Sequence, residues 1–194
     1  MTQPFLIAEG PWVQVRDANP TGLVIFRRHY SRYIYADGRL PQHFVGPGEK
    51  MVLLTPDARA LFAWRKFRSA DGQQGVNCAV FRNEGAGRAS DLILEAMVLA
   101  WERWPGERLF TFVNDRKVQH KRQPGRCFLK AGWRYVTADG RRARTKKRKL
   151  LILECYPEWA EALLACCATA HNHIEDTEVP EASRNLNAVS ELGT

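Results

Sequence analysis

The stretch VNCAVFRNEGAGRASDL, residues 76–92, decides the fold. Residues 76–81 form a short apolar run that predicts a buried strand, and residues 90–104 repeat apolar side chains at helical spacing. Between them lies Arg82-x-x-Gly85-x-Gly87, whose glycines let the backbone come close to a ligand because they carry no Cβ. Such a turn leaves backbone N–H groups free at a helix N-terminus and predicts a pyrophosphate site. The alternative is a strand–helix turn without a ligand.

The composition describes one globular domain with an anionic partner. The chain has 194 residues and a net charge of +8, which favours nucleic acid, a CoA-like cofactor or both over a merely basic protein. Five cysteines without regular spacing fit reduced thiols. The start lacks a secretory signal, and no apolar stretch approaches the roughly 20 residues of a membrane helix. We therefore expect a cytoplasmic protein without membrane contact; its oligomeric state stays open, a dimer included.

The remaining pattern alternates strands and helices. Asn19-Pro20 is a helix start, and apolar residues at helical spacing extend that helix to residue 34. Residues 1–173 are expected to form a single domain, and residues 174–194, which are polar, a disordered tail. The expected strands lie within 5–16 and at 51–55, 60–67, 76–81, 109–113, 132–136 and 150–155. The expected helices lie at 20–34, 90–104, 114–131 (interrupted) and 157–171, with loops at 38–49 and 138–148.

This order of elements resembles the GNAT acyltransferase family from about residue 10 to residue 155. The turn matches that family's pyrophosphate loop, Asn114 stands at a strand end, and Gly132-Trp133 follows the next helix. The resemblance implies an α/β (α+β) fold, with a mixed, mostly antiparallel sheet flanked by helices. It also implies an enzyme with acetyl-CoA or a related acyl-CoA as donor. The cofactor would be held by Arg82, Gly85, Ala86, Gly87 and Arg88, with the pantetheine along the strand at residues 77–80.

One position departs from the family. Many GNAT enzymes carry a tyrosine four residues before the Gly-aromatic pair, where it protonates the leaving thiolate. Phe128 stands at that position and has no proton to give. Either another residue nearby in sequence, Cys127 or Tyr135, is the acid, or the chemistry is not ordinary acetyl transfer.

A second resemblance is to the phage Mom-type DNA-modification proteins. It rests on His29-Tyr30-Ser31 with Arg27-Arg28 before it, and on the strand end Phe112-Val-Asn-Asp115. Those proteins are GNAT-like, alter the N6 amine of adenine in DNA and are described as needing iron. The resemblance implies catalytic and metal-binding roles for His29, Tyr30 and Asp115, and these ligand types suit Fe(II) or Mn. The alternatives are a surface His29, a Tyr30 packed in the core and an Asp115 that caps the next helix.

Basic residues are dense in the last third of the chain. Seven lie between residues 141 and 149, a density that predicts contacts with phosphates and a steep salt dependence. A solvated basic hairpin, or a site for the 3′-phosphate of CoA, is the alternative. A base modified inside a duplex must be flipped out, and Tyr33, Tyr35 and Phe44 are available to stack on it. The predicted DNA-binding residues are Arg27, Arg28, Arg32, Lys117, Lys121, Arg122, Arg141, Arg142, Arg144, Lys146, Lys147 and Arg148.

Together these patterns predict a DNA hypermodification enzyme. It would act on the N6 amine of adenine in double-stranded DNA and protect phage or mobile-element DNA from restriction. The first alternative is an acetyl-CoA-dependent N-acetyltransferase of a protein or small-molecule amine. The second is a DNA-binding protein that keeps the fold without turnover.

Overall fold

The computed structural model describes residues 10–70, 72–117 and 123–160. Its first half contains β1 (Val13–Val15), α1 (Pro20–Arg27), β2 (Glu49–Leu54), β3 (Ala60–Lys66), β4 (Val76–Asn83) and α2 (Ala89–Arg103). Its second half contains β5 (Leu109–Val113), the 3₁₀ turn η1 (Asp115–Lys117), α3 (Arg126–Lys130), β6 (Arg134–Tyr135), β7 (Thr137–Ala138), β8 (Arg141–Arg142) and β9 (Leu151–Cys155).

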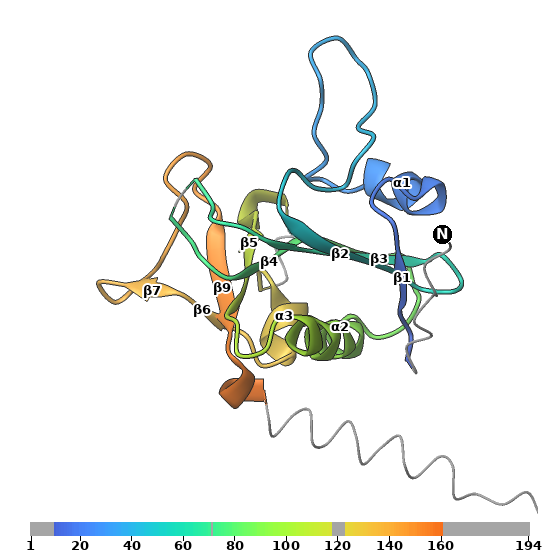
Figure 1. Cartoon of the computed structure of the whole chain (residues 1–194). Helices are drawn as coiled ribbons and strands as arrows, with labels where there is room; N and C mark the ends of the chain where they lie inside the picture. The colour runs from blue at the N-terminus through green and yellow to red at the C-terminus, as the bar shows by residue number, and fades with distance from the viewer. Residues whose placement is uncertain (1–9, 71, 118–122, 161–194) are drawn as a thin grey trace, which may run out of the picture.

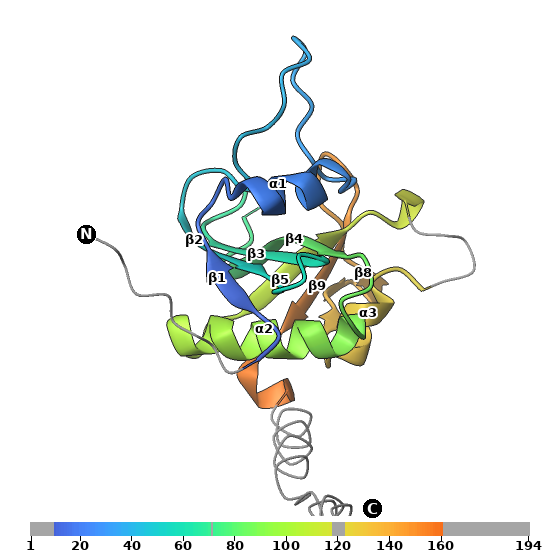
Figure 2. The same ribbon diagram turned by 90° about the vertical axis from the view of Figure 1, so that its right-hand side faces the viewer.

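Seven of the strands form one sheet in the order β1-β2-β3-β4-β5-β9-β6. Neighbours in this sheet are antiparallel except β4 and β5, which run parallel. The helix α1 lies on one face of the sheet, and α2 and α3 lie on the other (Figures 1 and 2). The expected mixed α/β class, with a mostly antiparallel sheet and few helices, is confirmed.

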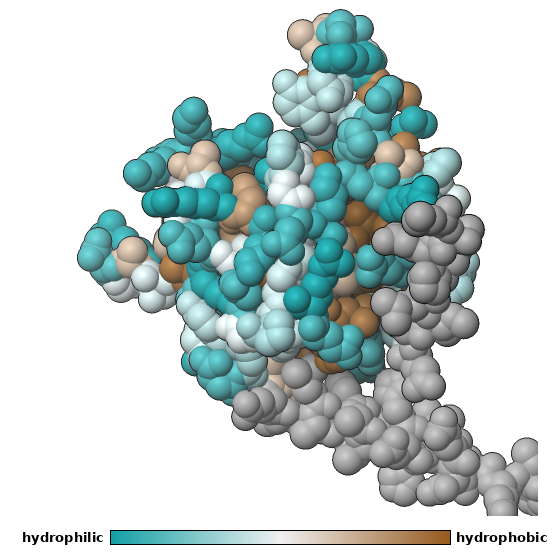
Figure 3. All heavy atoms as spheres, in the orientation of Figure 1, coloured by the Kyte–Doolittle hydropathy of each residue, from teal (hydrophilic) through white to brown (hydrophobic). Residues whose placement is uncertain are grey.

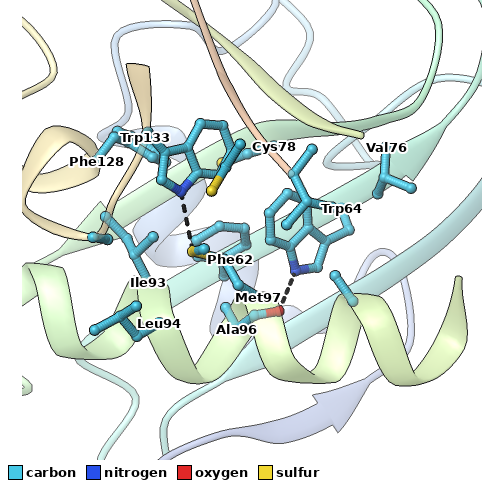
Figure 4. Close-up of a cluster of buried hydrophobic side chains, with 14 of the residues drawn as sticks. Phe62, Trp64, Val76, Cys78, Ile93, Leu94, Ala96, Met97, Phe128 and Trp133 are labelled. Carbon is cyan, nitrogen blue, oxygen red and sulfur yellow. Dashed lines mark hydrogen bonds between the residues drawn. The ribbon is translucent and has the colours of Figure 1, made fainter. Parts of the chain in front are cut away.

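The larger hydrophobic core lies between the sheet and α2. Phe62 and Trp64 of β3 point toward Ile93, Ala96 and Met97 of α2 (Figure 4), and all five are fully buried. The indole N–H of Trp64 donates to the Ala96 carbonyl at 2.9 Å, so its polar atom is satisfied. The predicted stretch from strand to helix is therefore the centre of the fold, because β4 and α2 both contribute to this core.

A smaller core lies between the sheet and α1. Ile25 and Phe26 of α1 pack with Val52, Leu61 and Val80, which alternate along their strands with residues of the larger core. Both faces of the central strands are thus covered. This explains why β2 and β3 read as nearly continuous apolar runs in the sequence.

The first helix is shorter than expected. Its start is as predicted, since the Asn19 side chain accepts from the Gly22 amide at 3.0 Å and Pro20 occupies the first turn. It ends at Arg27 rather than at residue 34, so that prediction is wrong. The Ser31 amide bonds to the imidazole of His29 at 3.2 Å instead of to the carbonyl four residues back. The amides of Arg28 and His29 already bond to the carbonyls three residues back, those of Ile25 and Phe26, at 3.1 and 2.8 Å, so the last turn tightens and the helix closes before Ser31 is reached.

Two more segments differ from expectation. The region 114–131 is not one interrupted helix: among the described residues it contains η1 and α3, and Gly125 begins α3 with φ +70°. The basic loop at 138–148 contains a hairpin of β7 and β8. Residues 157–160 are helical as expected, but the rest of the predicted last helix, and the expected tail, lie outside the described residues.

Within the described ranges no helix combines the length and the apolar character required to cross a membrane.

Candidate functional site

The site is built where β4 and β5 separate. The two strands pair only from Val76–Leu109 to Cys78–Thr111, although β4 continues to Asn83 and β5 to Val113. The pairing of β3 with β4 skips Ala79, which places a bulge at the same point. The Thr111 hydroxyl donates to the Cys78 carbonyl at 2.9 Å and ends the ladder there. Beyond this point the edge of β4 is open toward β5.

The turn after β4 is ordered by one side chain, that of Asn83. Its Oδ1 accepts from the amides of Gly85 and Ala86, both at 2.9 Å, and its Nδ2 donates to the Gly87 carbonyl at 2.8 Å. Gly85 and Gly87 have φ values of +100° and +150°, which favour glycine. The Gly85 and Ala86 amides, predicted to hold pyrophosphate, are therefore already engaged.

The next amides remain open. Among the described residues, none accepts a hydrogen bond from the backbone N–H of Gly87 or Arg88, which lead into α2. A Cβ on Gly87 would meet nothing within 4 Å, so the space beside the turn is empty. The Arg88 guanidinium lies 3.7 Å from the Asp91 carboxylate and is largely exposed. An anion could thus be held by fewer amides than predicted, at the helix start.

The Glu84 carboxylate joins this turn to the end of α1. It accepts from Arg28 Nε at 2.8 Å and from Arg82 Nε at 2.5 Å, and these two arginines lower the pKa of Glu84 to about 2. Arg82 also donates to the Arg28 carbonyl at 2.8 Å. Arg82 and Arg28, predicted to bind the cofactor and DNA respectively, are therefore held by Glu84.

His29 is buried, against the simple expectation of a surface histidine, with 6% of its surface exposed. Its Nδ1 accepts from the Ser31 amide and lies 2.7 Å from the Ser31 hydroxyl. Burial lowers the pKa of His29 to about 4, assisted by the charge of Arg82 and opposed by the Phe81 carbonyl of β4. The neutral ring thus carries its proton on Nε2 and lies against the edge of β4 at Phe81.

Tyr30 lies beside His29, with the two ring centroids 4.5 Å apart. Half of its surface is exposed, so it is not the core residue that helical spacing suggested. Its hydroxyl is the less accessible part: burial raises the pKa of Tyr30, opposed by the backbone N–H of Asn114, with Cys78 and Cys127 nearby. Tyr30 therefore presents a protonated phenol where β4 and β5 separate.

Asp115 begins η1, and its carboxylate accepts from Arg144 Nη2 at 2.6 Å. This hydrogen bond lowers the pKa of Asp115, and Arg144 also donates to the Lys149 carbonyl. The carboxylate thus anchors the basic loop. His29 and Asp115 are held by different partners, Ser31 and Arg144, so these hydrogen bonds do not direct the two side chains toward a shared iron ion.

The candidates for the missing acid are placed in different surroundings. Phe128 is buried against Trp133 at 4.9 Å between ring centroids, which makes it a core residue. The Tyr135 hydroxyl donates to the Pro124 carbonyl, and burial raises the pKa of Tyr135. Burial likewise raises the pKa of the Cys127 thiol, which lies near Tyr30. Among Cys127, Phe128, Tyr135 and Tyr30, only Tyr30 places a phenol hydroxyl beside the separated strands.

The predicted DNA-binding residues fall on two sides of the site. The residues Arg141, Arg142, Lys147 and Arg148 are exposed on and after the β7–β8 hairpin, where hydrophilic side chains gather (Figure 3). Lys146 is exposed beside them, while Arg142 also lies over the Tyr135 ring at 4.1 Å. Arg27 and Arg32 are exposed near the end of α1, and Lys117 is exposed in η1. Lys121 and Arg122 lie outside the described residues.

Sequence reasoning missed Asn83, Glu84 and the full extent of the segment after α1. Asparagine two residues before a glycine after a strand is a signal for a side-chain-ordered turn. Glu84 stands two residues after Arg82, and its long-range partner Arg28 gives no sequence signal. Comparison with protein-family models, with curated proteins and with solved structures gives no match to this chain.

Proposed function

We propose that this chain is a GNAT-like acyltransferase that acts on the N6 amine of adenine in double-stranded DNA. The observation that carries the proposal is the separation of parallel β4 and β5 beyond Cys78–Thr111, directly before the turn into α2. A strand order with a single parallel pair at this place supports the GNAT resemblance. The protein would act in the cytoplasm of a bacterial host and protect phage or mobile-element DNA.

The residues around the opening fit an acyl-CoA. Its pyrophosphate would lie at the amides of Gly87 and Arg88 and at the Arg88 guanidinium, and its pantetheine along residues 79–80 of β4, before the Phe81 carbonyl that His29 contacts. Asn83 holds the turn in place before the cofactor arrives, which reduces the ordering cost of binding. Such a donor supplies an activated acyl group as a thioester.

Acyl transfer then needs a proton for the departing thiolate. The adenine N6 forms a bond to the acyl carbon, the carbon–sulfur bond breaks, and the amine proton leaves as the thiolate gains one. Tyr30 is the candidate donor, because its phenol is protonated near neutral pH and faces the separated strands. His29 is a positioning residue, since its ring is neutral and both sides of it are engaged.

The DNA acceptor is supported by charge. Exposed Arg141, Lys147 and Arg148 stand on one side of the opening, and Arg27 and Arg32 on the other. Asp115 fixes the root of the basic loop through Arg144, which keeps its cations near the strand ends. If a duplex is bound across the opening, its phosphates would contact the cations of the basic loop and those near the end of α1.

The test is mass spectrometry of nucleosides from DNA of cells that express the protein. We expect a modified deoxyadenosine with the wild type and loss of at least nine-tenths of it with Tyr30→Phe. Tyr156→Phe, which removes a hydroxyl just after β9, at the end of the sheet away from the opening, is the matched control and should retain the product. Unmodified adenine in metal-replete cells would refute the proposal. Acetyl-CoA consumption with amines but not with DNA would indicate the N-acetyltransferase instead, and DNA binding without any product a non-catalytic protein.

A further inference from the structure

The chain makes a long excursion between α1 and β2. We call residues 30–43 the arm; in Figures 1 and 2 this part of the chain stands away from the sheet beyond α1. Figure 3 shows it projecting from the body, with hydrophobic and hydrophilic side chains mixed on it. The arm is not part of either hydrophobic core. Its shape is therefore not explained by the packing of the domain.

The arm carries an unusual share of exposed apolar surface. Within the described residues, every large hydrophobic side chain that is exposed lies on α1 or the arm. The three that project most are Ile34 at 71%, Tyr33 at 61% and Leu40 at 55% exposed. Concentration of such residues on one projection marks an interaction surface.

The charges around this apolar surface are mainly positive. Arg32 and Arg39 lie on the arm and Arg27 at its root, against one acid on the arm, Asp37, which pairs with Arg39 at 3.3 Å. The Arg39 guanidinium also lies 4.1 Å from the Tyr35 ring centroid. Among the described residues, neither Arg27 nor Arg32 has an acidic partner. The surface suits a partner that is anionic and has apolar faces.

A hollow of about 1000 Å³ lies behind the arm. Arg27 and Phe26 line it from α1, and Tyr33, Tyr35 and Arg39 line it from the arm. The root of the arm is fixed, since the Phe44 ring packs on Phe26 at 5.6 Å between centroids. Guanidinium groups beside aromatic rings are the elements with which proteins hold a sugar–phosphate strand and its bases.

We propose that the arm is a wedge that enters the base stack of duplex DNA through Ile34, flanked by Tyr33 and Leu40, which also line the hollow. The hollow behind it would receive the sugar–phosphate backbone through Arg27 and Arg39. Apolar side chains inserted between base steps unstack and kink DNA, which lowers the cost of moving a base out of the helix. This inference rests on the proposed DNA substrate. Tyr30 is the first residue of the arm and lies where β4 and β5 separate, so a base displaced by the arm would emerge next to this opening.

The test uses closed circular plasmid relaxed by a topoisomerase in the presence of the full-length protein, because insertion unwinds DNA whatever the target sequence. After removal of protein we expect a linking-number deficit with the wild type and at least a threefold smaller deficit with Tyr33→Ser, Ile34→Ser and Leu40→Ser combined. The triple variant should bind a labelled duplex at low salt no more than about threefold more weakly than the wild type. Val24→Ser, which changes an α1 residue that is 50% exposed, is the control and should behave as the wild type.

The outcomes separate the two proposals. If the arm variant leaves the same linking-number deficit as the wild type, the wedge is overturned while the DNA substrate stays in place. The same holds if the wild-type protein binds the duplex but leaves no deficit. Absence of binding to the duplex overturns both. A deficit that depends on the arm, together with unmodified adenine in cells, supports the wedge and refutes the enzyme. A dimer that dissociates in the arm variant during sedimentation, without a linking-number deficit, assigns the surface to a second copy of the chain.

Discussion

Protonation of His29 should destabilise the protein in mild acid. The ring is buried, its Nδ1 accepts from the Ser31 amide, and its pKa is lowered from 6.5 to about 4. At pH 7.5 the imidazole is neutral in both the folded and the unfolded chain. As the pH falls below 6.5 the unfolded chain binds the proton first, so stability decreases until about pH 4, below which the folded chain is protonated too. Linkage gives a loss of about 2 kcal/mol between pH 7.5 and pH 5 from this one group.

The measurement is urea unfolding at both pH values for the wild type and for His29→Asn. The asparagine retains an oxygen that can accept from the Ser31 amide, but it does not titrate. The free energy of unfolding of this variant should therefore change by about 2 kcal/mol less between the two pH values than that of the wild type. Val24→Ala, at an exposed side chain that does not titrate, is the control and should keep the wild-type difference. An equal change in unfolding free energy between the two pH values for the wild type and His29→Asn would contradict this prediction. That result would mean that His29 is accessible to protons in the folded state.

Three further outcomes are expected. Met97→Ala, at a fully buried side chain whose sulfur lies 3.0 Å from the Trp133 indole nitrogen, should cost about 3 kcal/mol in chemical unfolding, whereas Val24→Ala should cost less than about 0.5 kcal/mol. Replacement of Arg141, Lys147 and Arg148 by glutamine should reduce the slope of log Kobs for DNA against log salt by about 2 to 3, and an unchanged slope would show that this loop does not touch phosphate. Glu84→Gln removes the carboxylate that lies between Arg82 of the turn and Arg28 at the end of α1, so acetyl-CoA should bind roughly twofold more tightly in calorimetry. Weaker binding would mean that Glu84 is needed to position Arg82.

The central part of the fold could be predicted from the sequence because it depends on local patterns. Residues 109–113 were placed correctly as β5, and the stretch 76–92 contains both β4 and the start of α2. These elements are buried, so the spacing of their apolar residues along the sequence predicts whether each is a strand or a helix. The end of α1 could not be found in this way. Helical spacing continues through Tyr30 and Ile34, but Ser31 bonds to His29 and the chain turns out into solvent.

The candidate site shows the same division. The glycine turn is a local feature and was found, but the occupant of its first amides, Asn83, had to be seen in three dimensions. Helix geometry predicted an exposed His29 and a buried Tyr30, but His29 is buried and Tyr30 is half exposed. The reason is that α1 ends at Arg27, before either residue. The pairing of Asp115 with Arg144 joins residues far apart in sequence. Long-range contacts between charged residues carry no periodic signal, and such contacts decide whether a side chain is available for chemistry.

The same long-range contacts connect the arm to the glycine turn after β4. Arg28, at the end of α1, bonds to Glu84 of the turn, and the Arg28 carbonyl accepts from Arg82. His29, the next residue, lies against the Phe81 carbonyl of β4. The root of the arm is therefore fixed to the strand and turn that would hold the donor, not to the basic hairpin on the far side of the opening. A base displaced by the arm would meet the donor in a geometry set by these contacts, because a single carboxylate, that of Glu84, holds both arginines together.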